Sequence, residues 1–196
     1  MVMNLKTQLF NAFAPRPRPP VTRIVRSIVS DYESKQLHEL LSTKTPAELT
    51  DFDLRTVVEG NLWMLTPEAF LYFLPAFLHT SLEFYETISV FASEIIGALT
   101  KPSRADIVDG LGRIAQAHSE LGFSEAMVEL LRKQQLEWFD SGTPTAMFQE
   151  RFNDLTDAEG AAIFAFLVAF QNAYGADFPL GDLEMAIDRY WARYSS

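Results

Sequence analysis

His79 and Glu83 are the residues whose types and spacing come closest to a chemical site. They stand four apart in the stretch HTSLE, so a helix would place them on one face together with Glu86. A histidine and two carboxylates can ligate a metal ion. Metal sites in helical bundles usually repeat the carboxylate–histidine pair on a second helix, and the sequence contains no second pair. We therefore favour a solvated or salt-bridged face and predict no metal or other cofactor.

A proline interrupts the apolar run that precedes these residues. In AFLYFLPAFLH, Pro75 has no backbone donor and clashes with the carbonyl of Leu71, which predicts a kink or a helix end. One hypothesis is a pocket beside this break. The alternative is that the aromatic residues here are ordinary core and the kink only bends the helix. The candidate pocket residues are Trp63, Tyr72, Pro75, His79 and Glu83.

The second candidate site is an acidic surface for docking a protein. Asp182, Glu184 and Asp188 lie along the last predicted helix, where Glu184 and Asp188 are like charges four residues apart. Such a pair costs a few tenths of a kcal/mol, which indicates a cationic neighbour. That neighbour is Arg189, the basic N-terminus or a partner protein.

The charge balance narrows the choice of partner. The chain has a formal net charge of −10, although residues 1–30 contain Lys and Arg and no acid. A body this acidic is repelled by phosphate backbones, so we expect no nucleic-acid binding and favour a basic protein partner. The basic N-terminal segment either contacts an anionic partner or, as we prefer, packs on its own acidic body.

Other motifs of catalysis are absent from the sequence or out of context. Gly110-x-Gly112-x-x-Ala115 matches a dinucleotide fingerprint only superficially, because it lies in a helical pattern without a preceding strand. No Walker loop, H-E-x-x-H, EF-hand loop or G-x-S-x-G is present. His118, on an apolar helical stripe, is interpreted as a hydrogen-bonded boundary histidine. The lack of cysteine excludes thiol catalysis and agrees with a cytoplasmic location.

Helix signals dominate the whole chain. Thr66-Pro67-Glu68 and Thr156-x-x-Glu159 are typical helix starts. Apolar residues at helical spacing from Val21 predict a helix that continues or restarts to Leu41. The apolar run Ala161–Phe170 is too short for the roughly 20 residues of a membrane span, so we read it as a buried helix and predict no membrane contact.

These signals predict an all-α fold. We expect a single compact bundle of about seven to nine helices, with a kinked helix at Pro75 and a central apolar helix near residues 158–174. Residues 1–20 are predicted to form a basic, proline-rich arm, since the cluster PRPRPP favours an extended connector. Residues 21–196 are predicted to form a single all-helical domain.

The stretch LTPEAFLYFLPAFL, preceded by RPPVTRIVRSIVSDYE, resembles a bacterial family of unknown function. That family carries an L-T-P-E-A-F-x-Y-x-L-P-A signature. The resemblance covers about residues 19–79, with a weaker similarity over residues 151–173. It implies no activity and no catalytic residues.

The sequence is compatible with three functions. The first is a non-enzymatic protein-binding factor, immunity-like or accessory and regulatory, that docks through its acidic surface. The second is a small-molecule-binding protein or enzyme with a pocket beside Pro75. The third is a self-associating structural protein, a homo-oligomer in which the basic arm of one copy docks on the acidic body of another. We rank protein binding first and an enzyme last.

Overall fold

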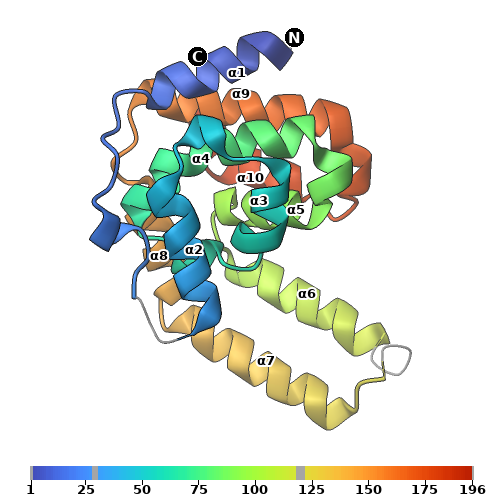
Figure 1. The fold of residues 1–196 in the computed structure, drawn as a ribbon. Coiled ribbons are helices and arrows are strands. Elements are labelled where there is room, and N and C mark those ends of the chain that lie inside the picture. The colour runs from blue at the N-terminus through green and yellow to red at the C-terminus, as the bar shows by residue number, and fades with distance from the viewer. Residues whose placement is uncertain (1, 28–30, 118–121, 196) are drawn as a thin grey trace. The chain divides into compact units, whose positions relative to one another are not determined.

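The structure is a computed structural model that describes residues 2–27, 31–117 and 122–195. Within these ranges it has ten α-helices and no β-strand, which confirms the all-α prediction (Figure 1). None of the helices in these ranges is long and apolar enough to cross a lipid bilayer. The α-helices are α1 (Val2–Phe13), α2 (Tyr32–Thr43), α3 (Asp51–Asp53), α4 (Pro67–Glu83), α5 (Tyr85–Leu99), α6 (Arg104–Ala117), α7 (Glu125–Asp140), α8 (Thr143–Phe152), α9 (Asp157–Tyr174) and α10 (Asp182–Arg189).

Shorter helical turns connect several of these helices. Among the described residues, five are 3-10 turns and one, η3, is a π-helical turn that directly continues α3. These turns are η1 (Val21–Arg23), η2 (Pro46–Glu48), η3 (Leu54–Val58), η4 (Leu62–Met64), η5 (Gly175–Asp177) and η6 (Trp191–Tyr194).

The chain divides into two compact units. The first comprises residues 1–100 and 151–196, and the second comprises residues 101–150. This division does not fall at residue 20, where the sequence placed the end of a basic arm. Helix α1 belongs to the first unit and contacts α4 and α9, because Leu5, Leu9 and Phe13 form a buried stripe at helical spacing.

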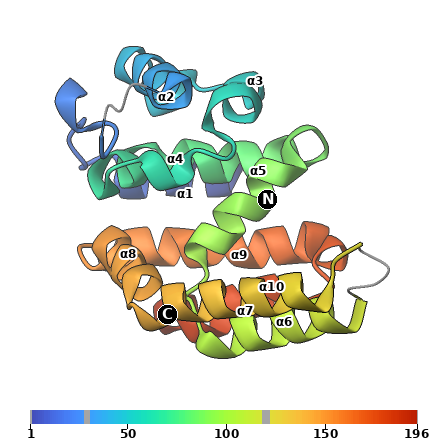
Figure 2. The same cartoon turned by 90° about the horizontal axis from the view of Figure 1, so that it is seen from below.

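Helix α9 is the centre of the first unit, as predicted for residues 158–174. It contacts α1, α4, α10 and η6, and it lies between the layer of α1 and α4 and the layer of α10 (Figure 2). Ile163, Phe166 and Phe170 are fully buried. The capping box of Thr156 and Glu159 starts the helix where the sequence predicted.

The basic N-terminal segment packs on its own chain, which agrees with the interpretation we preferred. Arg16 forms an ion pair with the buried Glu159 and donates to the Asp154 carbonyl at 3.0 Å. Arg18 donates to the Ser42 carbonyl at 2.6 Å, and Arg23 lies 2.6 Å from Glu68.

The helix predicted from Val21 is not formed as expected. Residues Val21–Arg23 make a single 3-10 turn, and Val25 then forms an isolated antiparallel bridge with Leu65. The bridge is flanked by backbone hydrogen bonds from Arg26 to Met64 and from Thr66 to Ile24. Helix α2 starts only at Tyr32. Ile28 and Val29, which contributed to the prediction, lie outside the described residues.

The second unit contains a pair of packed helices, α6 and α7. Leu111 and Val128 are buried, and Arg104 joins Asp140 by a two-point ion pair with distances of 2.9 and 3.3 Å. Gly110 and Gly112 lie inside α6, and within the described residues 31–117 the element before α6 is helix α5, not the strand that a dinucleotide fingerprint needs. His118 lies outside the described residues.

Candidate functional site

A pocket of about 330 Å³ lies in the first unit, between α1, α4 and the segment from η2 to α3. We call it the His79 pocket. Its lining comprises Lys6, Phe10, Pro46, Ala47, Leu49, Thr50, Asp51, Ala76, His79, Thr80, Glu83 and Phe84. Apolar side chains form much of this lining, and the charged groups are contributed by three separate segments. Such a combination is typical of ligand sites in proteins.

One wall of the His79 pocket is a face of α4. Ala76, His79, Thr80 and Glu83 occupy positions i, i+3, i+4 and i+7, so they lie along one side of the helix. Thr66 caps this helix by accepting a hydrogen bond from the Ala69 N–H at 3.1 Å. The wall is therefore a regular helix with a fixed start, which holds its side chains in defined positions.

Helix α4 continues through Pro75, so the helix end considered from the sequence does not occur there. A proline in a helix interior costs about 3 kcal/mol or more. Leu71, Leu74, Phe77 and Leu78 are almost fully buried on either side of it. Each such side chain contributes roughly 1.5–3 kcal/mol on burial, so packing outweighs the cost of the proline.

His79 is the most chemically distinctive group in the pocket. Its Nε2 lies 2.9 Å from Oε2 of Glu83, and the Phe10 ring meets it edge-on at 6.2 Å. Burial lowers the pKa of the His79 imidazole, and the Lys6 ammonium lowers it further against the opposing effect of Glu83. The ring is therefore neutral at pH 7. The short distance to Glu83 favours the tautomer with the hydrogen on Nε2, which then donates a hydrogen bond to the Glu83 carboxylate.

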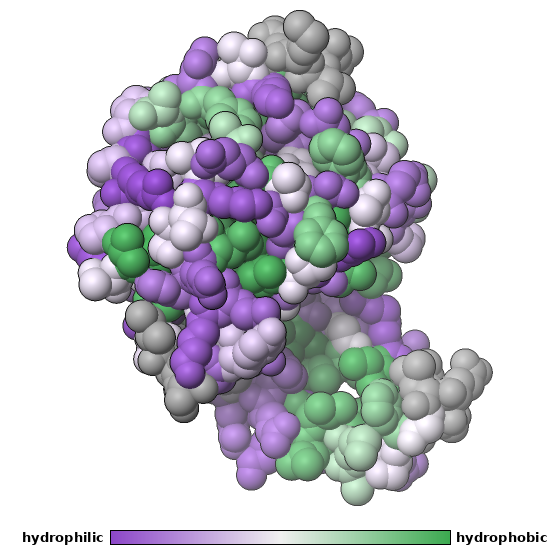
Figure 3. Space-filling view, viewed as in Figure 1, coloured by the Kyte–Doolittle hydropathy of each residue, from purple (hydrophilic) through white to green (hydrophobic). Residues whose placement is uncertain are grey.

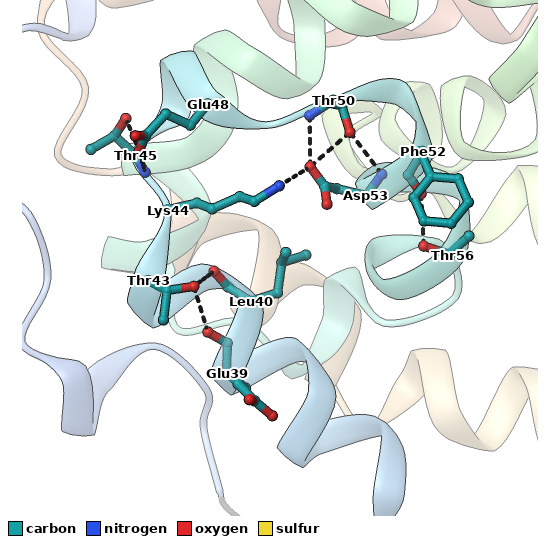
Figure 4. Close-up of polar contacts among 10 residues, drawn as sticks. All are labelled: Glu39, Leu40, Thr43, Lys44, Thr45, Glu48, Thr50, Phe52, Asp53 and Thr56. Carbon is teal, nitrogen blue, oxygen red and sulfur yellow. Dashed lines mark hydrogen bonds and ion pairs between the residues drawn. The ribbon is translucent and has the colours of Figure 1, made fainter.

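The opposite wall is a short segment held by two reciprocal capping boxes (Figure 4). The Thr45 N–H donates to Glu48 at 2.7 Å, and the Thr50 N–H donates to Asp53 at 2.9 Å. Lys44 also donates to Asp53, at 2.6 Å. Burial alone would raise the pKa of Asp53, but the bonds from Lys44 and Thr50 outweigh it and hold that pKa below its ordinary value. These bonds stiffen the pocket wall.

Phe84 contributes an exposed aromatic ring to the pocket. The face of the first unit seen in Figure 3 is largely hydrophilic with separate hydrophobic patches, and isolated apolar side chains on a surface are normal. Phe84 differs from these because it is 41% exposed and also lines a cavity. A ligand in the pocket would cover part of this ring.

The structure brings together two of the five residues predicted to line a pocket. His79 and Glu83 line it, whereas Trp63, Tyr72 and Pro75 do not. Tyr72 precedes His79 by two helical turns, which separates them by roughly 10 Å along α4, and its ring contacts Phe73. Trp63 is 58% exposed in η4.

The sequence did not predict the two walls of the pocket that α1 and the segment from η2 to α3 supply. Lys6 and Phe10 come from α1, Leu49 and Asp51 from the other wall. The stripe of Leu5, Leu9 and Phe13 was a signal that α1 packs on the core, but it does not show against which helix.

The acidic residues of α10 lie apart from this lining. Glu184 is exposed and accepts a hydrogen bond from the Gln171 amide at 2.8 Å, and Asp188 is exposed in the last turn. Asp182 is half-buried in the first turn, where an acid complements the helix dipole. Within the described residues, no three His, Asp or Glu side chains gather in a way that could hold a metal ion.

Comparison with known proteins gives no relative for this chain. No family model matches it, and no curated protein and no solved structure is significantly similar to it. The resemblance to a bacterial family of unknown function stays a prediction.

Proposed function

We propose that this protein binds a small ligand in the His79 pocket. One observation carries the proposal: a cavity of about 330 Å³ combines apolar side chains with charged groups from three separate segments. That volume falls at the lower end of the range of roughly 300–1,000 Å³ that ligand pockets occupy. The second of our hypotheses from the sequence was a small-molecule binder or enzyme with a pocket beside Pro75. The His79 pocket is not lined by Pro75, but it supports ranking ligand binding first.

The geometry supports binding more than catalysis. A histidine that activates a nucleophile needs a hydroxyl or thiol within hydrogen-bonding distance, about 2.6–3.2 Å. Among the described side chains, the hydrogen-bonding partner of His79 is the carboxylate of Glu83, and the chain has no cysteine. The His79–Glu83 pair therefore shapes and polarises the pocket.

A fragment screen followed by NMR on the ¹⁵N-labelled full chain tests this proposal. Ala47 is exposed at the centre of η2 and lines the pocket, so A47W should obstruct the cavity without disturbing the core. Ala176 is exposed at the centre of another 3-10 turn, η5, and A176W is the matched control. We expect fragments that shift the amide resonances of His79 and Phe84, weaker binding in A47W and unchanged binding in A176W.

Two results would contradict ligand binding at this site. A screen in which no fragment perturbs the pocket resonances would remove the proposed function. Equal binding to A47W and A176W would place the fragments elsewhere on the molecule.

A second proposal is that the acidic face of α10 docks a basic protein. The supporting observation is that Glu184 and Asp188 are both exposed, four residues apart on a short helix of an acidic chain. Close like charges are relieved by a cation that binds between them. A lysine-rich peptide is a suitable probe at low ionic strength, and reversing Asp182, Glu184 and Asp188 to Lys should abolish its binding. Unchanged affinity would rule out this surface.

A cytoplasmic location is also a proposal, supported by the cysteine-free composition. Fluorescence microscopy of a tagged chain in its host tests it. Enrichment of the signal at the cell boundary would count against the proposal.

A further inference from the structure

Opposite charges line the His79 pocket without pairing with one another. Lys6 lies on α1, whereas Asp51 and Glu83 lie on the other two walls. Among the described residues, no ion pair joins Lys6 to either carboxylate. A single cavity therefore presents a cation and two anions at positions that do not neutralise each other.

The two carboxylates suit an ammonium group. Glu83 uses one oxygen to accept from His79, and a carboxylate can accept about four hydrogen bonds, so it retains most of its capacity. Because the neighbouring imidazole is neutral, it does not compensate the charge of Glu83.

Lys6 suits a carboxylate. Its side chain is exposed on α1, one helical turn before Phe10, so both point toward the same cavity. Its charge is one of the causes that lower the pKa of His79, which agrees with an ammonium that lines the pocket. An anionic group bound beside Lys6 would therefore gain a favourable interaction.

Apolar side chains lie between these charged groups. Phe10 is half-buried, Leu49 and Ala76 are buried, and Phe84 leaves part of its ring exposed. Building on the proposed ligand-binding function, we propose that the ligand is a small zwitterion with an apolar side chain, of the α-amino-acid class. Its ammonium binds between Asp51 and Glu83, its carboxylate binds Lys6, and its side chain covers Phe10, Leu49 and Phe84.

Three probes that differ in one charged group test the proposal. L-Phenylalanine carries both charges, phenethylamine lacks the carboxylate, and 3-phenylpropionate lacks the ammonium. The full chain is titrated with each at pH 7 and low ionic strength, and amide shifts of the pocket residues report binding. We expect L-phenylalanine to bind about tenfold more tightly than either analogue, since each analogue lacks one charge-assisted interaction with the pocket.

Two variants assign each charge to its partner. K6Q should remove the advantage of L-phenylalanine over phenethylamine and leave the affinity for phenethylamine unchanged or higher. D51N should reduce the advantage over 3-phenylpropionate, because Glu83 alone then faces the ammonium. If either variant fails to fold, the comparison of the three probes on the unaltered chain still decides the question.

The outcomes separate this inference from the function on which it depends. Equal binding of phenethylamine and L-phenylalanine would mean a site for simple cations and would overturn the zwitterion. Equal binding of 3-phenylpropionate would overturn it in favour of an anion site. Fragments that occupy the pocket while none of the three probes binds would refute the ligand class and leave the proposed function intact. An empty fragment screen would refute both.

Discussion

Replacing Gly160 by alanine tests how closely η6 packs on α9. A Cβ atom built at Gly160 would lie 2.3 Å from Cε1 of Tyr194, with two further ring atoms within 2.5 Å. Carbon atoms in contact normally lie about 3.5–4.0 Å apart, so the ring must retreat by more than 1 Å. Trp191, fully buried, belongs to the same turn as Tyr194, so this retreat strains the anchoring of η6.

Two opposing terms set the size of the effect. Alanine in place of glycine stabilises a helix interior by up to about 1 kcal/mol. Overpacking a close contact typically costs about 1–3 kcal/mol. We therefore expect G160A to lower the free energy of unfolding by about 1 kcal/mol. Gly97 is the matched control, because it lies in α5 and a Cβ built there meets no atom within 4 Å. G97A should stabilise the protein by up to about 1 kcal/mol.

The measurement is urea unfolding followed by circular dichroism, with the slope of each curve checked for constancy. In a Y194A background the clash is absent, so the same G160A substitution should become neutral or stabilising. A double-mutant cycle over Gly160 and Tyr194 should give a coupling energy of about 1–3 kcal/mol. If G160A stabilises the protein as much as G97A does, or if the cycle shows no coupling, the Tyr194 ring moves aside freely and the reasoning fails.

Three further predictions concern buried polar groups of the first unit. Trp191 Nε1 donates a buried hydrogen bond of 2.7 Å to the Leu99 carbonyl, and W191F removes the donor. The substitution should lower the free energy of unfolding in urea by about 1–3 kcal/mol. An unchanged unfolding midpoint would show that water replaces the donor. Asp53 has a lowered pKa, so its contribution to stability is present above its unfolded pKa near 3.8 and is lost as pH falls through the folded value. D53N should therefore flatten the dependence of the unfolding free energy on pH below about pH 5. If the curve for D53N ran parallel to that of the unaltered protein, this prediction would be wrong. His79 also has a lowered pKa, so stability should fall as pH drops below about 6.5, and H79Q should remove that loss.

Local signals in the sequence predicted the starts of the principal helices. Thr66 and Thr156 each cap the helix that follows, as their hydroxyls, first-turn acids and spacing indicated. A cap needs only atoms that lie within one helical turn, so its recognition does not depend on the rest of the fold. The sequence also predicted the central position of α9, because a helix without a polar face must be covered by other elements.

Predictions that depended on distant contacts were less successful. Ile24 and Val25 have helical spacing, but both are buried where the chain pairs with residues 64–66. That pairing is long-range, so periodicity alone cannot reveal it. His79 and Glu83 could be placed together because a helix joins them, whereas Lys6 reaches the same pocket only through the packing of α1 on α4.

The way the His79 pocket is built bears on what it can bind. One wall is the uninterrupted helix α4, and another is locked by the bonds among Lys44, Thr50 and Asp53. A site on such elements is formed before its ligand arrives, so little ordering entropy opposes binding. Small fragments, which have few atoms with which to offset such a cost, should therefore bind measurably. A pocket that had to fold around its ligand would reject them, so the affinity of the smallest probes is itself a test of this construction.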